Sequence, residues 1–122
     1  MFTHTVLFAT LSPDDLEERG PISREEAIEL FRSFPFEEEL TKREGNADLT
    51  VPTLTFTAEA DGSSLTIWSA DPGEFLIWVP AIFGLAGGVT DPEDVADCVD
   101  LFFDSDLETL GIRLIRLEEK YS

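Results

Sequence analysis

The sequence predicts an α+β protein, a two-layer sandwich in which two helices cover one face of a mostly antiparallel five-stranded sheet. Short segments of alternating apolar and polar residues predict the strands, and two capped segments with apolar residues at helical spacing predict the helices. The predicted order is β-α-β-β-β-α-β, which is typical of helices packed on one face of an antiparallel sheet. At 122 residues with 43% hydrophobic content, the chain is expected to form one domain, residues 1–122.

The N-terminal third is expected to contain one strand and one well-marked helix. The strand covers residues 3–11, and a helix follows Ser23, whose side chain can form a capping box with Glu26 three residues later. Pro35 stops or kinks this helix, because proline lacks the N–H that continues the helical hydrogen bonds. Residues 36–44 are expected to add another helical turn or two.

The middle of the chain is predicted to form a meander of three strands joined by tight turns. Residues 53–58 alternate strictly, and Asp61-Gly62 favours a two-residue type I′ turn into a return strand at residues 65–69. A second turn at residues 71–73 leads to a third strand at residues 75–79. Tight turns of this kind place the three strands next to one another in the sheet.

The last third is predicted to contain a loop, the second helix and the fifth strand. The glycine-rich residues 84–90 are expected to be a loop, and Asp91 then caps a helix that has Pro92 at its first position. The apolar stripe of this helix is Val95, Cys98, Val99, Phe102 and Phe103. Residues 111–117 are predicted to form the last strand, which a charged tail follows.

The two tight turns also set the register of the meander, and with it the face on which each side chain lies. They pair Phe56 with Ile67 and Trp68 with Ile77. The face expected to pack on the helices is made of Leu54, Phe56, Ala58, Leu65, Ile67, Leu76 and Trp78. The opposite face then carries Trp68, Phe75, Ile77 and Val79.

This second apolar group would face solvent in a two-layer protein, and contiguous exposed apolar groups usually have a function. One alternative is that the following loop, residues 80–85, folds back over the group. The other is an interface for a partner or for a second copy of the chain. That interface is centred on Trp68 and includes Phe83 of the same loop, because interface cores favour aromatic residues.

The strongest chemical signal is acidity, since 26 aspartates and glutamates oppose 8 lysines and arginines and give a net charge of −18. No lysine or arginine occurs between Arg43 and Arg113, a segment that contains 14 of the acids. Such a charge repels nucleic acid and anionic membranes and attracts basic proteins. Two explanations remain open: docking on a basic partner, or solubility and adaptation to high salt in a halophile's housekeeping domain.

Four of the acids lie on one face of the helix predicted after Asp91. Their spacing of four, three and four residues aligns them opposite the apolar stripe, and they are Glu93, Asp97, Asp100 and Asp104. Like charges at this spacing destabilise a helix by about 0.2–0.5 kcal/mol per pair, so a neutral or basic residue would suit the fold better. The stripe is either a solvated outer face or a docking strip for the arginines and lysines of a partner.

No catalytic, metal-binding or cofactor-binding site is expected. The only cysteine, Cys98, lies on the apolar side of its predicted helix, where a thiol acts as a small filler and not as a nucleophile for the only histidine, His4. Zinc would need more nitrogen and sulfur ligands than these two residues supply. A calcium loop beginning at Asp104 fails, because Thr109 and Ile115 occupy the positions of its glycine and its glutamate.

The sequence therefore predicts a small acidic binding protein, not an enzyme, that docks on or inhibits a basic protein. The form we favour is a bacterial immunity-type inhibitor of a toxin such as a nuclease. The alternative is a homodimeric structural or regulatory module that uses the Trp68 face. A cytoplasmic location without membrane contact is expected, because no signal peptide is recognisable, the longest apolar stretch has only 15 residues, and one cysteine cannot form an internal disulfide.

Overall fold

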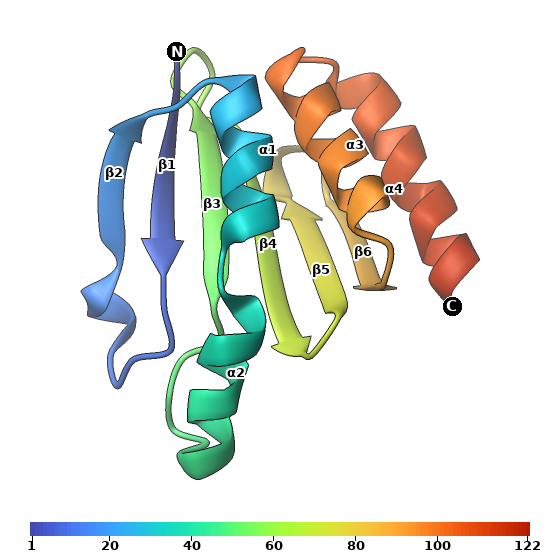
Figure 1. Ribbon diagram of the computed structural model, residues 1–122. Helices are drawn as coiled ribbons and strands as arrows, with labels where there is room; N and C mark the ends of the chain where they lie inside the picture. The colour runs from blue at the N-terminus through green and yellow to red at the C-terminus, as the bar shows by residue number, and fades with distance from the viewer.

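One antiparallel sheet of six strands and four α-helices make up the computed structural model, which describes residues 1–122 (Figure 1). The strands are β1 (Phe2–Leu7), β2 (Glu17–Pro21), β3 (Thr53–Ala58), β4 (Ser64–Asp71), β5 (Glu74–Val79) and β6 (Gly84–Val89). The helices are α1 (Arg24–Ser33), α2 (Phe36–Gly45), α3 (Pro92–Phe103) and α4 (Leu107–Tyr121), with two short 3-10 helices, η1 (Pro13–Asp15) and η2 (Pro80–Ile82). The predicted α+β class and antiparallel pairing are confirmed, whereas the five strands and two helices are corrected to six and four.

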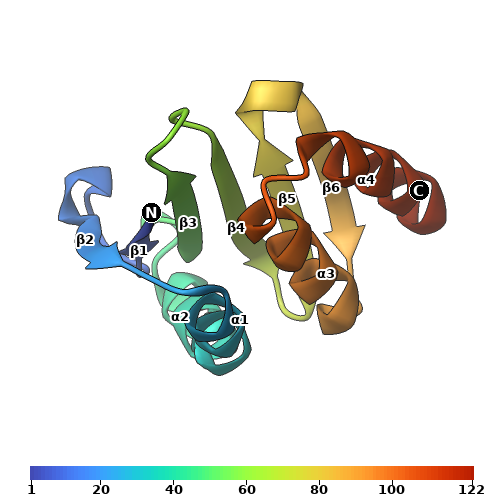
Figure 2. The same cartoon turned by 90° about the horizontal axis from the view of Figure 1, so that it is seen from above.

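The helices form a layer on one face of the sheet, whose strand order is β2-β1-β3-β4-β5-β6. Viewed from above, α1, α2 and α3 gather on one side of the strands (Figure 2). The last helix, α4, packs along β6 so closely that a Cβ added to Gly84 would lie 2.6 Å from Cδ1 of Leu114. A cluster of 22 buried apolar residues fills the space between the two layers.

The first helix begins where the sequence predicts. The Ser23 hydroxyl accepts a hydrogen bond from the N–H of Glu26 at 3.2 Å, and the Glu26 carboxylate accepts one from the N–H of Ser23 at 3.1 Å, so the capping box is formed. A proline separates α1 from α2, as predicted. Phe31 of α1 and Phe36 of α2 pack on the Phe75 ring of β5, with centroids 5.2 and 5.3 Å away, and join both helices to the sheet.

Two strands were not expected from the sequence pattern. Residues 17–21 form β2, a charged edge strand that lacks apolar alternation and takes its structure from pairing with β1. Residues 84–89, predicted as a loop, form β6 because β5 pairs with them in spite of three glycines. The strand predicted over residues 3–11 is shorter than expected, since β1 ends at Leu7.

The segment predicted as the last strand, residues 111–117, lies within α4. The Asp106 carboxylate caps this helix by accepting a hydrogen bond from the N–H of Thr109 at 3.1 Å. The buried residues recur at helical spacing, and they are Leu110, Leu114 and Leu117. The helical spacing of these leucines therefore outweighs the preference of the β-branched residues between them for a strand.

The β3–β4 hairpin keeps its predicted faces although its register differs by two residues. Its loop has four residues, since Ala58 donates its N–H to the carbonyl of Ser63 at 2.8 Å. Phe56 consequently pairs with Leu65 and not with Ile67, so the predicted two-residue turn is wrong. A shift of two leaves every side chain on its expected face, because faces alternate with a period of two.

A bulge in β4 changes the register of the β4–β5 hairpin by one residue. Ile67 pairs with Ile77, whereas the predicted tight turn requires a pair with Trp78. Ser69 is fully buried at the bulge, and its hydroxyl hydrogen-bonds to the carbonyl of Asp71 at 2.9 Å and to a second carbonyl across the turn at 2.8 Å. A bulge adds one residue to one strand, so it reverses the faces predicted for β5.

Of the four residues predicted to form an exposed apolar group, only Trp68 lies on the side of the sheet without helices. Ile77 and Val79 are fully buried, and Phe75 packs between α1 and α2. The large apolar residues of β4 and β5 on the side without helices are Trp68, Leu76 and Trp78. The prediction that Leu76 and Trp78 lie in the core is therefore wrong.

Candidate protein-docking surface

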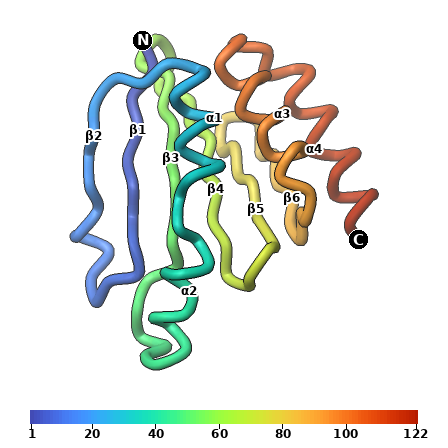
Figure 3. The backbone as a smooth tube through the Cα atoms, viewed as in Figure 1, coloured from blue at the N-terminus to red at the C-terminus, as the bar shows by residue number.

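The acidic stripe lies on α3, which runs between α1 and α4 (Figure 3). On the α1 side, Nε of Arg24 lies 3.4 Å from Oδ1 of Asp100, and the guanidinium also contacts Asp104. One further pair joins Arg32 to Glu93 at 3.0 Å. Three of the four acids in the stripe therefore contact arginines of α1.

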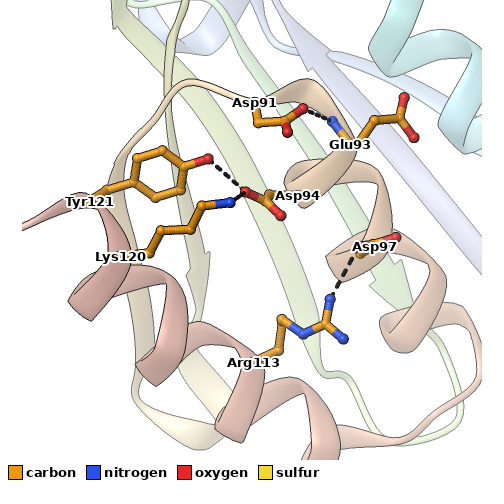
Figure 4. A network of polar contacts seen from close by, with 7 residues as sticks. All are labelled: Asp91, Glu93, Asp94, Asp97, Arg113, Lys120 and Tyr121. Carbon is orange, nitrogen blue, oxygen red and sulfur yellow. Dashed lines mark hydrogen bonds and ion pairs between the residues drawn. The ribbon is translucent and has the colours of Figure 1, made fainter.

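The other side of α3 is paired with α4 in the same way (Figure 4). Nη1 of Arg113 lies 3.1 Å from Oδ2 of Asp97. One turn earlier, Oδ2 of Asp94 accepts hydrogen bonds from Nζ of Lys120 at 2.8 Å and from the hydroxyl of Tyr121 at 2.6 Å. The two helices are thus joined by charged contacts along their length.

All four acids predicted as a docking strip contact arginines of neighbouring helices. The sequence between Arg43 and Arg113 contains no base, but the fold brings bases to it from both ends of the chain. These pairs are exposed, so each contributes only about 0.2–1 kcal/mol to stability. The stripe thus has a structural explanation in the contacts among three helices, and binding of a partner there stays an untested prediction.

Asp94 differs from the acids of the stripe, because only 16% of its side chain is exposed. Hydrogen bonds from Lys120 and from Tyr121 lower the pKa of Asp94, and the hydrogen bond to Asp94 raises the pKa of Lys120. We expect Asp94→Asn to lower the free energy of unfolding at pH 7 by about 1–2 kcal/mol, because a charge-assisted contact is lost. The exposed pair at Asp97 provides the control, and Asp97→Asn should cost less than about 1 kcal/mol in the same urea titration.

The effect of Asp94→Asn should also depend on pH. Because the folded-state pKa of Asp94 is lowered, its stabilisation is fully present above the unfolded-state value of about 3.9 and is lost as the pH falls through the folded-state pKa. Because the pKa of Lys120 is raised, its share is fully present below about 10.4 and is lost as the pH rises through the folded-state pKa. A difference between wild type and variant that persists unchanged into strong acid would contradict this account.

Exposed apolar side chains gather where β6 meets α4. Phe83 is 89% exposed and Leu85 44%, while on α4 Ile112 is 49% and Ile115 62% exposed. The loop expected to fold back over the sheet, residues 80–85, instead forms η2 and the start of β6. It extends the sheet and leaves the Phe83 ring in solvent.

Phe83, Leu85 and Ile115 border a groove of about 370 Å³ between β6 and α4, which we call the β6–α4 groove. Its apolar lining is Ile82, Phe83, Leu85, Leu114 and Ile115. Two carboxylates, Glu118 and Glu119, also line it. An apolar groove with an acidic margin has the composition of a protein-binding surface, in which an apolar centre is surrounded by polar residues.

The charges of α4 are separated between its two sides. Arg113 and Lys120 point toward α3 and pair with its aspartates. The groove side carries Glu118, which accepts a hydrogen bond from the N–H of Gly87 at 2.5 Å, and Glu119, which forms no ion pair. The margin of the groove is acidic because two of the three bases of this helix pair on its other side, and the third, Arg116, does not line the groove.

The backbone of Phe83 adopts a left-handed conformation, with φ 50° and ψ 29°. This conformation costs an L-residue about 1–2 kcal/mol, which glycine would avoid. No burial of the ring offsets the cost, since Phe83 is the most exposed of the large apolar residues. A strained residue without a packing role is the kind of outlier that occurs at binding sites.

Cys98 and His4, the two residues considered for catalysis, have structural roles. The Cys98 thiol is fully buried, and burial raises its pKa to about 12, which makes it a poor nucleophile at neutral pH. Nδ1 of His4 lies 2.9 Å from the carbonyl oxygen of Gly20 in β2. No group of three or more histidine, cysteine, aspartate and glutamate side chains is placed to hold a metal ion. None of the helices combines the length and the apolar run that crossing a membrane requires.

The sequence indicates Phe83 but not the other exposed apolar residues in and beside the groove. Leu85 was assigned to a loop, and Ile112 and Ile115 were assigned to a strand. Their three-residue spacing, on the side of α4 opposite the buried leucines, is the signal that a helical assignment would have revealed. No protein-family model matches the chain, and neither a curated protein nor a solved structure matches it.

Proposed function

We propose that this protein binds a basic partner protein through the β6–α4 groove, with Phe83 as the central contact. The observation that carries the proposal is an exposed and conformationally strained aromatic residue beside an apolar groove that has acids and no base along it. An aromatic centre with a complementary charged margin is the usual composition of a specific interface. The partner is expected to present an apolar side chain surrounded by lysines and arginines.

The distribution of charge supports a basic partner. Seven of the 26 acids form ion pairs within the chain, and the other 19 form none. The resulting field accelerates the approach of a cationic protein and disfavours acidic competitors. Because salt screens such a field over about 8–10 Å, the association rate should fall as the ionic strength rises.

The concrete form of the proposal is a bacterial immunity-type inhibitor of a toxin. Toxins that act on nucleic acid carry basic surfaces, since binding of the phosphate backbone requires lysines and arginines. An acidic protein that covers such a surface would block access of the substrate. If the partner is such a toxin, co-expression of this protein should restore the growth of cells that produce the toxin.

The binding experiment compares two pairs of neutralised acids that change the net charge equally. Glu118→Gln/Glu119→Gln removes the charge beside the groove, whereas Glu25→Gln/Glu29→Gln removes two exposed charges of α1. Immobilised wild type should retain basic proteins at about 0.05 M salt and release them at about 0.5 M. The groove pair should lose more binding than the α1 pair, with the retained proteins identified by mass spectrometry.

Two results would contradict the proposal. Binding that survives about 0.5 M salt unchanged would show that charge does not direct it. Equal loss in the two variants would show that the net charge matters but the groove does not. In the second case, the surface that binds would have to be sought elsewhere on the protein.

The surplus of acid also predicts a salt-dependent stability. With a net charge of −18 and most carboxylates unpaired, repulsion within the folded protein weakens as salt is added. We expect Tm to rise by about 3–8 °C between low salt and about 1 M sodium chloride, with a nonionic osmolyte as control. Loss of cooperative unfolding at low salt would favour the alternative of a halophile's housekeeping domain, and an unchanged Tm would contradict the repulsion itself.

A further inference from the structure

The side of the sheet away from the helices carries three rows of uncharged residues, which we call the open face. The rows cross the strands in register, and they are Leu7, Thr53, Trp68 and Leu76; then Thr5, Thr55, Thr66, Trp78 and Leu85; then Thr3, Thr57 and Ser64. No α-helix lies over β1, β3 and β4 on this side (Figure 2). Both tryptophans of the chain belong to the open face.

The absence of charge on this face is unusual for the chain. Aspartate, glutamate, lysine and arginine make up 28% of the residues, yet none occurs in the three rows. Charge begins at the edges of this face: the row of Thr5 continues to Glu18 of β2, which borders a hollow with Thr3 and Thr57, and Glu74 lies near the β4–β5 turn. A basic partner gains little on an uncharged surface, because its attraction is to the carboxylates elsewhere.

A second copy of this chain is the occupant that the charge distribution favours. Two molecules of net charge −18 repel one another through most of their surfaces. Only contact through an uncharged face avoids placing carboxylates against carboxylates. A two-fold axis makes such a contact self-complementary, because the same surface is used on both subunits.

The size of the face fits a weak symmetric dimer. Strands about 4.8 Å apart and three rows about 6.6 Å apart give a footprint of roughly 20 by 20 Å. This footprint is about 400 Å², below the roughly 800 Å² per partner that interfaces of standard size bury and in the range of weak, transient contacts. The expected dissociation constant is therefore on the order of micromolar.

We propose that the open face joins two copies of this protein in a two-fold symmetric dimer, with Trp68 and Trp78 near its centre. The two sheets would pack face to face about 10 Å apart, with the strands inclined by about 30°. Trp68 pairs with Leu76 and Trp78 with Leu85, so the large apolar side chains gather toward β5 and β6, whereas threonines predominate on β1 and β3. The dimer goes beyond the proposed function, and of the residues named for the open face only Leu85 also lines the β6–α4 groove.

The effect of salt concentration distinguishes dimerisation through this face from docking on a basic partner. Salt screens the repulsion between two acidic copies, so it should strengthen the dimer, whereas it should weaken binding to a basic protein. Sedimentation velocity from about 1 to 500 µM, at about 0.05 and 0.5 M sodium chloride, measures the dimer directly. Tryptophan emission provides a second readout, because both indoles become shielded from water on dimerisation and the emission should shift to shorter wavelength.

A pair of variants tests whether the open face is the interface. Thr66→Glu places a carboxylate at the centre of the face, where the hydroxyl of Thr66 lies 3.2 Å from that of Thr55. Thr109→Glu makes the same change on the exposed first turn of α4. We expect Thr66→Glu to raise the dissociation constant at least about tenfold and Thr109→Glu to leave it unchanged.

The outcomes are distinct. Wild type that becomes dimeric with concentration and salt, together with a monomeric but folded Thr66→Glu, supports the proposal. Wild type that remains monomeric at about 500 µM and about 0.5 M salt overturns it. Dimerisation of Thr66→Glu as strong as that of wild type also overturns it, since the contact would then lie on another face.

Discussion

Replacing Ile77 with aspartate is expected to leave the protein unfolded, whereas the same change at the adjacent Leu76 is expected to leave it folded. Ile77 is fully buried and pairs with Ile67 across β4 and β5. A carboxylate in this apolar surrounding costs more than about 4 kcal/mol, a large part of the stability of a domain of this size. Leu76 lies on the open face, where an aspartate costs only about 1 kcal/mol in apolar contact and strand propensity.

Both variants add the same charge to the same strand, so a difference between them reports the face on which each side chain lies. Circular dichroism and urea unfolding should show no cooperative transition for Ile77→Asp and a normal one for Leu76→Asp. The tight turn predicted at Pro72-Gly73 requires the opposite result, because it places Leu76 in the core. Should Leu76→Asp unfold the protein while Ile77→Asp folds, the bulge at Ser69 and the open face would both be wrong.

The parts of the fold that depend on neighbouring residues are predictable from the sequence. β3 spans the residues that strict alternation predicts, Thr53–Ala58. The capping box at Ser23 forms because its two hydrogen bonds join residues only three positions apart. In the β3–β4 hairpin, even a wrong loop length left the faces right, since the error was a shift of two residues.

The parts that were not predictable depend on contacts between distant segments. The bulge in β4 is stabilised by the buried hydroxyl of Ser69, which hydrogen-bonds to carbonyl groups in and across the β4–β5 turn. The sequence alone predicts a tight two-residue turn there without a bulge. β6 is a strand only because β5 pairs with it. In α4 the helical spacing of three leucines competes with β-branched residues, and packing against Gly84 of β6 favours the helix.

The candidate site shows the same division. Phe83 is recognisable in the sequence as an aromatic residue in a loop, but the groove beside it needs α4 and β6 to be adjacent. The acidic stripe is recognisable as a helical pattern, but the arginines that pair with it come from α1 and α4. Charge counted along the chain therefore overstates how many carboxylates are free for a partner.

Replacing Phe83 with glycine is expected to weaken binding of the basic partner at least about tenfold while making the protein more stable. The ring is the most exposed large apolar group beside the groove, so its loss removes an interface contact and almost no packing within the chain. Glycine adopts the left-handed conformation at φ 50° without the steric cost, which should raise the free energy of unfolding by about 0.5–1 kcal/mol. Opposite changes in binding and stability would show that the residue is retained for recognition.

Ser105 provides a matched control, because it has the other positive φ among the non-glycine residues, 58°. It follows α3 at the end of a Schellman turn, in which Asp106 donates its N–H to the carbonyl of Leu101 at 3.2 Å, and it does not line the groove. Ser105→Gly should therefore gain similar stability in urea unfolding and bind the partner as wild type does. A Phe83→Gly variant that binds as tightly as wild type would exclude Phe83 as the central contact. One that loses stability would instead show that the ring supports the fold, because relief of the left-handed strain would then be outweighed by lost contacts of the side chain.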